Sequence, residues 1–166
     1  MSNKMLLLDL DAAALKCDEP VECAYFYHPD NNGLKDLREM AAFVLTCRHC
    51  EEKPCVAACP RDALEKQEDS SVVRHNLRCV ACGSCVTACP FGVISPDVIS
   101  YISAVCDQCA RFGDEEPPCV KSAPKGILTW IDNDDPCLKE KNVHEIGDRL
   151  AVRCNRWERE AVGSEQ

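Results

Sequence analysis

The sequence has few aromatic residues, no excess of basic charge and no long apolar run. Phe, Trp and Tyr make up 5% of its 166 residues, although aromatic rings supply much of the packing energy of ordinary cores. Asp and Glu outnumber Lys and Arg by 28 to 19, which gives a net charge of −9. An acidic chain is a poor match for nucleic-acid phosphates. The sequence therefore argues against a nucleic-acid-binding protein, and it predicts a chain that apolar burial alone does not stabilise.

The N-terminal region lacks the pattern of an export signal. Its apolar run, Met5 to Leu8, ends at Asp9, whereas a secretory signal needs roughly 7–15 apolar residues. A membrane-spanning helix needs about 18 or more. A twin-arginine pair is also absent. We therefore expect a cytoplasmic chain without a direct membrane span.

Nucleotide-binding and catalytic motifs are missing as well. The sequence contains neither a GxGxxG motif nor a Walker loop. It has no set of Ser, His and Asp and no carboxylate pair that indicates catalysis. We therefore predict that the chain is not an enzyme by itself.

The sequence is instead rich in cysteine, with 15 residues of this type. Thiols at this density indicate either disulfides or metal ligands, and a reducing cytoplasm disfavours disulfides. Bound metal would also supply folding free energy that the few aromatic residues cannot. We therefore interpret the thiols as metal ligands.

The most regular cysteine motif is Cys79-Val-Ala-Cys82-Gly-Ser-Cys85-Val-Thr-Ala-Cys89-Pro90. Its spacing is that of bacterial [4Fe–4S] ferredoxins, in which the fourth cysteine binds the other of two clusters. A related motif precedes it, Cys47-Arg-His-Cys50-Glu-Glu-Lys-Pro-Cys55-Val-Ala-Ala-Cys59-Pro60. The interlocked pairing predicts two clusters, one held by Cys47, Cys50, Cys55 and Cys89 and the other by Cys79, Cys82, Cys85 and Cys59.

Ordinary secondary structure is expected around these motifs. Residues 71–75 predict a strand of a short hairpin, and residues 126–131 predict a strand followed by a turn over 132–136. A helix is expected from about residue 31 into Cys47, because apolar residues recur there at helical spacing. Its apolar stripe consists of Leu34, Leu37, Ala41, Val44 and Leu45.

Two incomplete copies of the motif flank the intact pair. After it, Cys106-Asp-Gln-Cys109 is followed by Cys119, and Ala123-Pro124 stands where Cys-Pro would end the motif. Before it, Cys17 and Cys23 occupy the first and third cysteine positions, while Pro20 and Tyr27 occupy the second and fourth. The first copy has too few thiols for a cluster, and the last copy lacks one ligand.

In this order of four motifs the chain resembles the four-cluster ferredoxin-type iron–sulphur subunits of complex oxidoreductases, such as those of formate dehydrogenase and dimethyl sulphoxide reductase. The resemblance implies an α+β fold of two bacterial ferredoxin-like [4Fe–4S] modules, with short hairpins and short helices around the clusters. The inner two-cluster module is expected over 47–99. The outer, degenerate module is expected over 1–46 plus 100–136 with one cluster, and a C-terminal extension over 137–166.

The resemblance also implies a third cluster in the outer module, because the outer motifs of that family pair as the inner ones do. Cys106, Cys109 and Cys119 would be three of its ligands. The family takes the fourth ligand from the position of Tyr27, and Cys23 lies four residues earlier, on the same face if the segment is helical. Cys23 is therefore the preferred fourth ligand.

Two alternatives to Cys23 stay open. Cys17 is the second choice, and a [3Fe–4S] cluster without a fourth protein ligand is the third. With Cys23 as ligand, Cys17, Cys137 and Cys154 are left over, and we interpret them as small buried side chains.

The expected cofactors are thus three [4Fe–4S] clusters, and the expected function is electron transfer. The resemblance implies an iron–sulphur subunit of a larger, anaerobic oxidoreductase whose large catalytic subunit holds molybdenum or tungsten on a pterin, or is a hydrogenase. A further electron-transfer subunit is an additional expected partner. The most specific candidate is a tungsten enzyme such as class II benzoyl-CoA reductase or aldehyde oxidoreductase. Two alternatives are a free-standing polyferredoxin electron shuttle and, in another class, a zinc-binding protein-interaction module.

Overall fold

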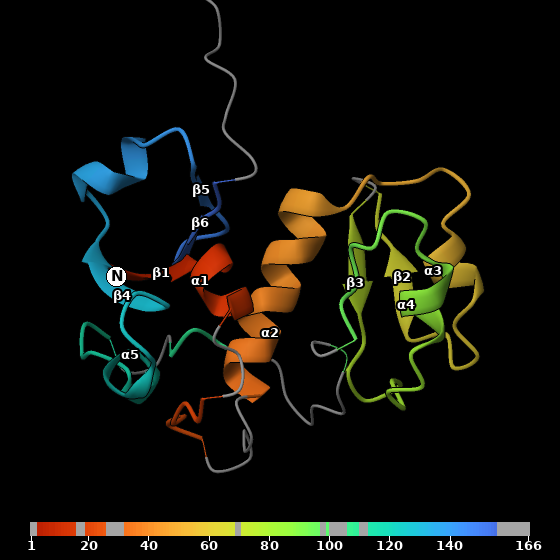
Figure 1. Ribbon diagram of the computed structural model, residues 1–166, viewed down its shortest axis with the longest axis horizontal. Coiled ribbons are helices and arrows are strands. Elements are labelled where there is room, and N and C mark those ends of the chain that lie inside the picture. The colour runs from red at the N-terminus through yellow and green to blue at the C-terminus, as the bar shows by residue number, and fades with distance from the viewer. Residues whose placement is uncertain are drawn as a thin grey trace, which may run out of the picture. The chain divides into compact units, whose positions relative to one another are not determined.

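The computed structural model describes residues 3–15, 19–25, 32–68, 71–96, 99, 106–109 and 113–155. Figure 1 shows a mixture of short helices and short strands, which confirms the predicted α+β class. The chain forms two compact units: a sheet unit, Met1–Ala24 with Asp107–Gln166, and a central unit, Tyr25–Cys106. Among the described residues, no helix has the length and apolar character needed to cross a membrane.

A four-stranded sheet organises the sheet unit, with the strand order β4-β1-β6-β5. β1 (Lys4–Asp9) pairs antiparallel with β4 (Leu128–Asp132) and parallel with β6 (Leu150–Arg153). β5 (Val143–Glu145) pairs antiparallel with β6 and lies at one edge. The helices of this unit are α1 (Leu10–Leu15), α5 (Pro118–Ser122) and the 3-10 helix η3 (Pro136–Lys139).

β1 is buried on both of its faces. Each residue from Met5 to Leu8 is at most 4% exposed, and a continuous apolar run of this kind fits a strand that is covered on both sides. Leu7 packs with Ile131 of β4 and Val143 of β5 in one of the hydrophobic clusters of the unit. The sequence did not predict this strand, because four apolar residues do not distinguish a buried strand from a buried helix.

The strand and the turn that the sequence predicted beyond the cysteine motifs are confirmed. The strand is β4, and the turn at Asn133 and Asp134 leads into η3. Asp135 caps η3 by accepting a hydrogen bond from the Cys137 N–H at 2.9 Å. Residues after 137, expected as an extension, supply β5 and β6 to the sheet.

Leu8→Ala is expected to lower the free energy of unfolding of the sheet unit by about 2–5 kcal/mol, because truncating a buried leucine leaves a cavity. The Leu8 side chain is fully buried in the central strand. Urea unfolding followed by tryptophan fluorescence would measure the loss, since Trp130 lies opposite Leu6 in β4. Leu15→Ala is the matched control, because Leu15 is 85% exposed and its loss should cost under roughly 0.5 kcal/mol. Equal losses in the two variants would contradict the central role of β1.

The central unit consists of short elements between the cysteine loops. α2 (Asn32–Ala41) continues into a π-helical turn, η1 (Ala42–Thr46), and a hairpin is formed by β2 (Leu64–Lys66) and β3 (Val72–Arg74). Two further helices lie in the described part of this unit, α3 (Pro54–Ala57) and α4 (Ser84–Ala88). β3 confirms the hairpin strand predicted over 71–75.

The helix predicted to run into Cys47 is confirmed, but its apolar stripe is displaced at the C-terminal end. The first three positions of the stripe are buried as expected, whereas Val44 is 51% exposed and Phe43 is buried instead. The cause is the π turn, in which the Cys47 N–H donates to the Ala42 carbonyl, five residues back, at 3.1 Å. A π turn adds one residue to the helical turn and so rotates the following side chains. The prediction that Val44 packs in the stripe is therefore wrong.

Candidate metal centres

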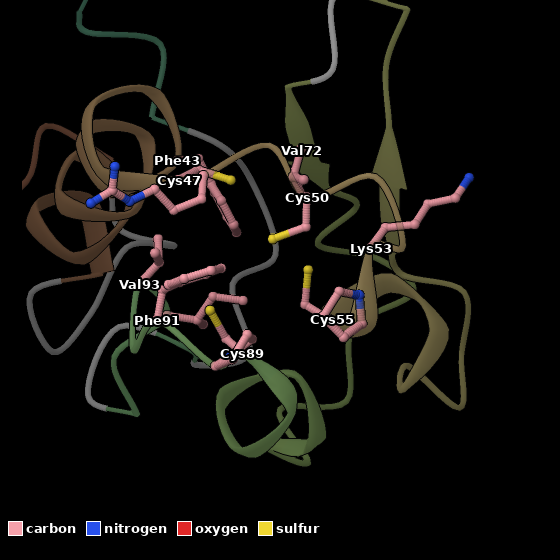
Figure 2. Close-up of a pocket in the computed structure, with 13 residues that line it drawn as sticks. Phe43, Cys47, Cys50, Lys53, Cys55, Val72, Cys89, Phe91 and Val93 are labelled. Carbon is pink, nitrogen blue, oxygen red and sulfur yellow. The ribbon is translucent and has the colours of Figure 1, made fainter.

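The eight cysteines of the two intact motifs gather in two sets of four within the central unit. The first set lines one cavity, and Figure 2 shows its sulfur atoms directed into the shared space: Cys47, Cys50, Cys55 and Cys89. The second set lines another cavity: Cys59, Cys79, Cys82 and Cys85. Each set takes three cysteines from one motif and the fourth from the other. The structure thus brings together the same four residues that each predicted cluster requires.

The walls of the first cavity are otherwise largely apolar. Phe43, Val72 and Phe91 line it together with the four thiols, while the Lys53 side chain points away from it. The cavity measures about 400 Å³ including space open to solvent. Soft thiolate ligands around an apolar space suit an iron–sulphur cluster. The donor set therefore fits the predicted cofactor.

The cysteine loops share an unusual backbone conformation. In three motifs the residue directly before the second cysteine has a left-handed conformation: His49 (φ 50°), Ala81 (φ 55°) and Gln108 (φ 54°). Non-glycine residues seldom adopt positive φ values, so the repetition is a property of the motif. In turns with such left-handed residues, successive backbone N–H groups can form concave nests that receive anionic groups, iron–sulphur sites included. The incomplete last motif, with Gln108, keeps this feature of the complete ones.

A second repeated feature follows the final position of the same three motifs. The residue three positions later again has positive φ: Asp62 (φ 48°), Gly92 (φ 63°) and Gly126 (φ 93°). In the complete motif of α4, the Cys89 N–H donates to the Cys85 carbonyl at 3.1 Å, and in the last motif the Ala123 N–H donates to the Cys119 carbonyl at 3.0 Å. Ala123 therefore occupies the backbone position of a fourth cysteine and lacks only the thiol.

Three cysteines of the predicted third cluster lie in the sheet unit, and their thiols interact. Burial, and then the negative charges of Cys109 and Cys23, raise the pKa of the Cys119 thiol to about 12. The segment that carries Cys23 is held to α5 by the Glu22 N–H, which donates to Ser122 Oγ at 2.8 Å. The Ser122 hydroxyl in turn donates to the Pro118 carbonyl at 2.9 Å. The structure thus brings Cys23 together with Cys109 and Cys119.

The remaining candidates for the third cluster are placed differently. Cys106 is the last residue of the central unit, where its N–H donates to the Asp36 carboxylate. Cys17, the second choice for the fourth ligand, and Tyr27 lie outside the described residues. Of the cysteines interpreted as unused, Cys154 is buried as expected, and Cys137 is partly buried.

The long segment between Cys109 and Cys119 is anchored to the sheet. Arg149 donates to the Gly113 carbonyl at 3.0 Å, and Trp130 Nε1 donates to the Asp114 carbonyl at 3.2 Å. The Arg149 guanidinium also stacks over the Trp130 ring, 5.7 Å from its centroid, which adds a cation–π attraction. These contacts order the approach to α5 and its cysteine.

Several hydrogen bonds reach the sulfur atoms themselves. The Ala63 N–H donates to Cys59 Sγ at 3.2 Å, and the Ala81 N–H donates to Cys79 Sγ at 3.4 Å. The Ser84 hydroxyl lies 3.4 Å from Cys82 Sγ and lowers the pKa of that thiol, because a hydrogen bond stabilises the thiolate. Burial raises the pKa of Cys85. The hydrogen bonds to Cys59, Cys79 and Cys82 oppose this effect of burial, because they stabilise thiolates, the form in which cysteine binds metal.

Charged residues beside the cysteines were missed by the sequence analysis. Lys66 donates to the Cys50 carbonyl at 3.0 Å. Arg74 lines the second cavity, hydrogen bonds the Cys79 side chain and pairs with buried Glu39. The one sequence signal for Lys66 and Arg74 is their position in the hairpin between the two motifs. The burial of an arginine depends on tertiary contacts, which the sequence does not show.

Comparison with known proteins identifies a domain that carries this site. The model of a 4Fe–4S dicluster domain matches residues 38–133. The putative oxidoreductase AegA of Escherichia coli K12 is 33% identical over 144 residues, which cover 79% of this chain and 21% of that protein. The uncharacterized ferredoxin MJ0265 of Methanocaldococcus jannaschii is 38% identical over 88 residues, 53% of this chain and 49% of that protein.

A third relative is a sulfite dehydrogenase subunit of Allochromatium vinosum. It is 34% identical over 107 residues, which cover 59% of this chain and 45% of that protein. The chain thus spans less than half the length of each of these three relatives.

Proposed function

Because the chain belongs to the 4Fe–4S dicluster domain family, we propose that it is an electron-transfer subunit with three [4Fe–4S] clusters in a larger oxidoreductase. The chain is an iron–sulphur electron-transfer protein with [4Fe–4S] clusters and is related to oxidoreductases. Family membership removes the alternative of a zinc-binding interaction module. The number of clusters and the partner belong to the proposal.

The observation that carries the proposal is the interlocked grouping of eight thiols around two cavities. We assign one cluster to Cys47, Cys50, Cys55 and Cys89, and a second to Cys59, Cys79, Cys82 and Cys85. A bound [4Fe–4S] cluster accepts and releases one electron. The chain contributes the thiolates, the backbone N–H groups that face sulfur, and the apolar walls that limit water around the site.

The third cluster is assigned to Cys106, Cys109, Cys119 and Cys23. It is supported by the left-handed loop residue before Cys109 and by the interaction of the Cys23 and Cys119 thiols. In this assignment the inner module spans 47–99, the outer module 1–46 plus 100–136, and the extension 137–166. The first motif, with Cys17 and Cys23 only, holds no cluster of its own.

The proposed partner is a large catalytic subunit with molybdenum or tungsten on a pterin, in an anaerobic cytoplasmic enzyme, together with a further electron-transfer subunit. The order of the four motifs supports this assignment through its resemblance to the iron–sulphur subunits of such enzymes. The relative from Allochromatium vinosum is itself named as one subunit of a redox enzyme, a sulfite dehydrogenase. The most specific form of the proposal is a tungsten enzyme such as class II benzoyl-CoA reductase or aldehyde oxidoreductase.

Anaerobically purified protein is expected to contain about twelve irons and twelve labile sulphides per chain, four of each per cluster. Iron and sulphide analysis would measure this, together with a visible absorbance that dithionite bleaches. About sixteen irons would contradict the absence of a cluster in the first motif, and about eight would mean that the last motif binds none.

The partner is tested by gel filtration of native, anaerobic extract with detection of this chain. Co-elution with a large protein that contains molybdenum or tungsten is expected. Elution at the size of the free chain would contradict the subunit assignment and favour a free-standing electron shuttle.

A further inference from the structure

The β2–β3 hairpin carries one cation to each of the two cysteine sets. Lys66, at the end of β2, donates from Nζ to the Cys50 carbonyl at 3.0 Å and to the His49 carbonyl at 3.5 Å. Arg74, at the end of β3, lines the cavity of the second set and hydrogen bonds the Cys79 side chain. Because Lys66 pairs with Val72 whereas Arg74 pairs with Leu64, the two cations lie at opposite ends of the hairpin.

The two cations differ sharply in burial and in partners. The Arg74 side chain is 2% exposed and the Glu39 side chain 8%. Arg74 Nε donates to Glu39 Oε1 at 2.5 Å, and its terminal NH2 group donates to the other carboxylate oxygen, so the pair is bidentate. Lys66 reaches backbone carbonyls at a partly exposed place.

Stability alone is a weak explanation for the buried pair. Removing two charges from water costs free energy that their attraction often does not repay, and well-packed apolar residues frequently replace such pairs without loss. Besides pairing with Glu39, Arg74 lines the cavity of the second set together with Cys79, whose side chain is a hydrogen-bond partner of the guanidinium. A buried positive charge therefore lies at the cavity that the second set of cysteines lines.

We propose that Arg74, held in place by Glu39, raises the reduction potential of the cluster bound by Cys59, Cys79, Cys82 and Cys85. The inference rests on the proposed function, because it requires that these thiols hold a [4Fe–4S] cluster. One-electron reduction, with the electron supplied by a redox partner or by a mediator, adds negative charge at the thiolates and the bound group. No bond forms or breaks in this step. A buried cation and a hydrogen bond to sulfur both favour the reduced form.

Lys66 acts in the same direction on the other cluster but more weakly. Water and salt screen an exposed charge more than a buried one. The hairpin therefore separates the potentials of the two clusters, with the larger increase at the cluster beside Arg74. Arg74 is not a ligand of the cluster and acts on its potential through Cys79.

The test is an EPR-monitored redox titration of the full-length protein with its clusters. Glu39→Gln removes the opposing negative charge and is expected to raise one midpoint potential. The double variant Arg74→Gln/Glu39→Gln removes both charges, and its midpoint should fall below that of the unaltered protein, because Arg74 is the charge that contacts Cys79. Lys66→Gln should lower a different midpoint by a smaller shift.

The matched control is the exposed pair Arg153–Glu140 of the sheet unit, whose atoms lie 3.1 Å apart. Arg153→Gln/Glu140→Gln should leave every midpoint unchanged. If the iron content is intact and Glu39→Gln and the double variant share the midpoints of the unaltered protein, the inference is wrong while the proposed function survives. If the double variant loses its clusters, the midpoint potential of the Glu39→Gln variant alone tests the inference, since that variant keeps the arginine. Absence of any iron–sulphur signal in the unaltered protein would overturn the proposed function itself.

Discussion

Removal of the clusters by anaerobic chelation is expected to unfold the central unit and to leave the four-stranded sheet largely folded. A hydrophobic cluster of the central unit includes the buried Cys79 and Cys85, and four partly buried motif cysteines pack against it. Without a bound group, each set of four thiols lacks the cofactor that joins its members, and the free energy of metal binding is lost from folding. The sheet unit differs because fully buried aliphatic side chains such as Leu6, Leu8, Val143 and Leu150 form its core.

Limited proteolysis of the full chain would separate these outcomes. In the protein without clusters, trypsin is expected to cut rapidly within the central unit, for example at Arg61 and Lys66, while fragments from β1 and from β4 to β6 stay protected. Far-UV circular dichroism should fall without disappearing. Retention of native circular dichroism and of a cooperative thermal transition after chelation would show that the thiol-lined core is stable by itself.

Cys23→Ala is expected to convert or remove the third cluster and to leave the other two intact. The negative charge of Cys23 contributes to the raised pKa of Cys119, after burial and Cys109, and Ser122 holds the neighbouring Glu22 against α5. Iron content should fall from about twelve to about eight if the cluster is lost, or to about eleven if a [3Fe–4S] cluster remains. EPR of the oxidised variant would distinguish the two results, because a [3Fe–4S] cluster is paramagnetic when oxidised.

Cys137→Ala is the matched control for this variant. Cys137 lies in η3 and packs against the hydrophobic cluster that contains Met5, Leu7 and Ile131, not among the motif cysteines. Its loss should change neither iron content nor spectrum. If Cys23→Ala kept all of its iron while Cys17→Ala lost a cluster, the fourth ligand would be Cys17, and the three-cluster assignment would stand.

The sequence predicted the features that short spacings encode. The grouping of the cysteines followed from two interlocked motifs, and β3, β4 and most of the helix before Cys47 followed from local apolar patterns. The π turn that exposes Val44 did not follow, because nothing in the residue pattern distinguishes it from a continued α-helix. The left-handed loop positions were also hidden, since His49, Ala81 and Gln108 occupy them rather than glycine.

Contacts between distant segments were the other part that the sequence could not supply. β1 pairs with β6 from the opposite end of the chain, and no local pattern specifies such a partner. The same holds for Arg74 and Glu39, which lie on a hairpin and on α2 and meet only in the folded unit. Arginine and glutamate are usually exposed, so composition alone favoured the surface for both.

The parallel pairing of β1 with β6 has a consequence for the order in which the protein is made. Leu6 lies opposite Leu150, so β1 leaves the ribosome long before its partner strand is translated. The whole central unit, an insertion between β1 and β4 in the chain, is complete by then, and segments that emerge first generally fold first. Its cysteine loops can therefore receive iron and sulphide before β6 is available to β1. Pairing of β6 with β1 then joins segments on either side of the finished central unit.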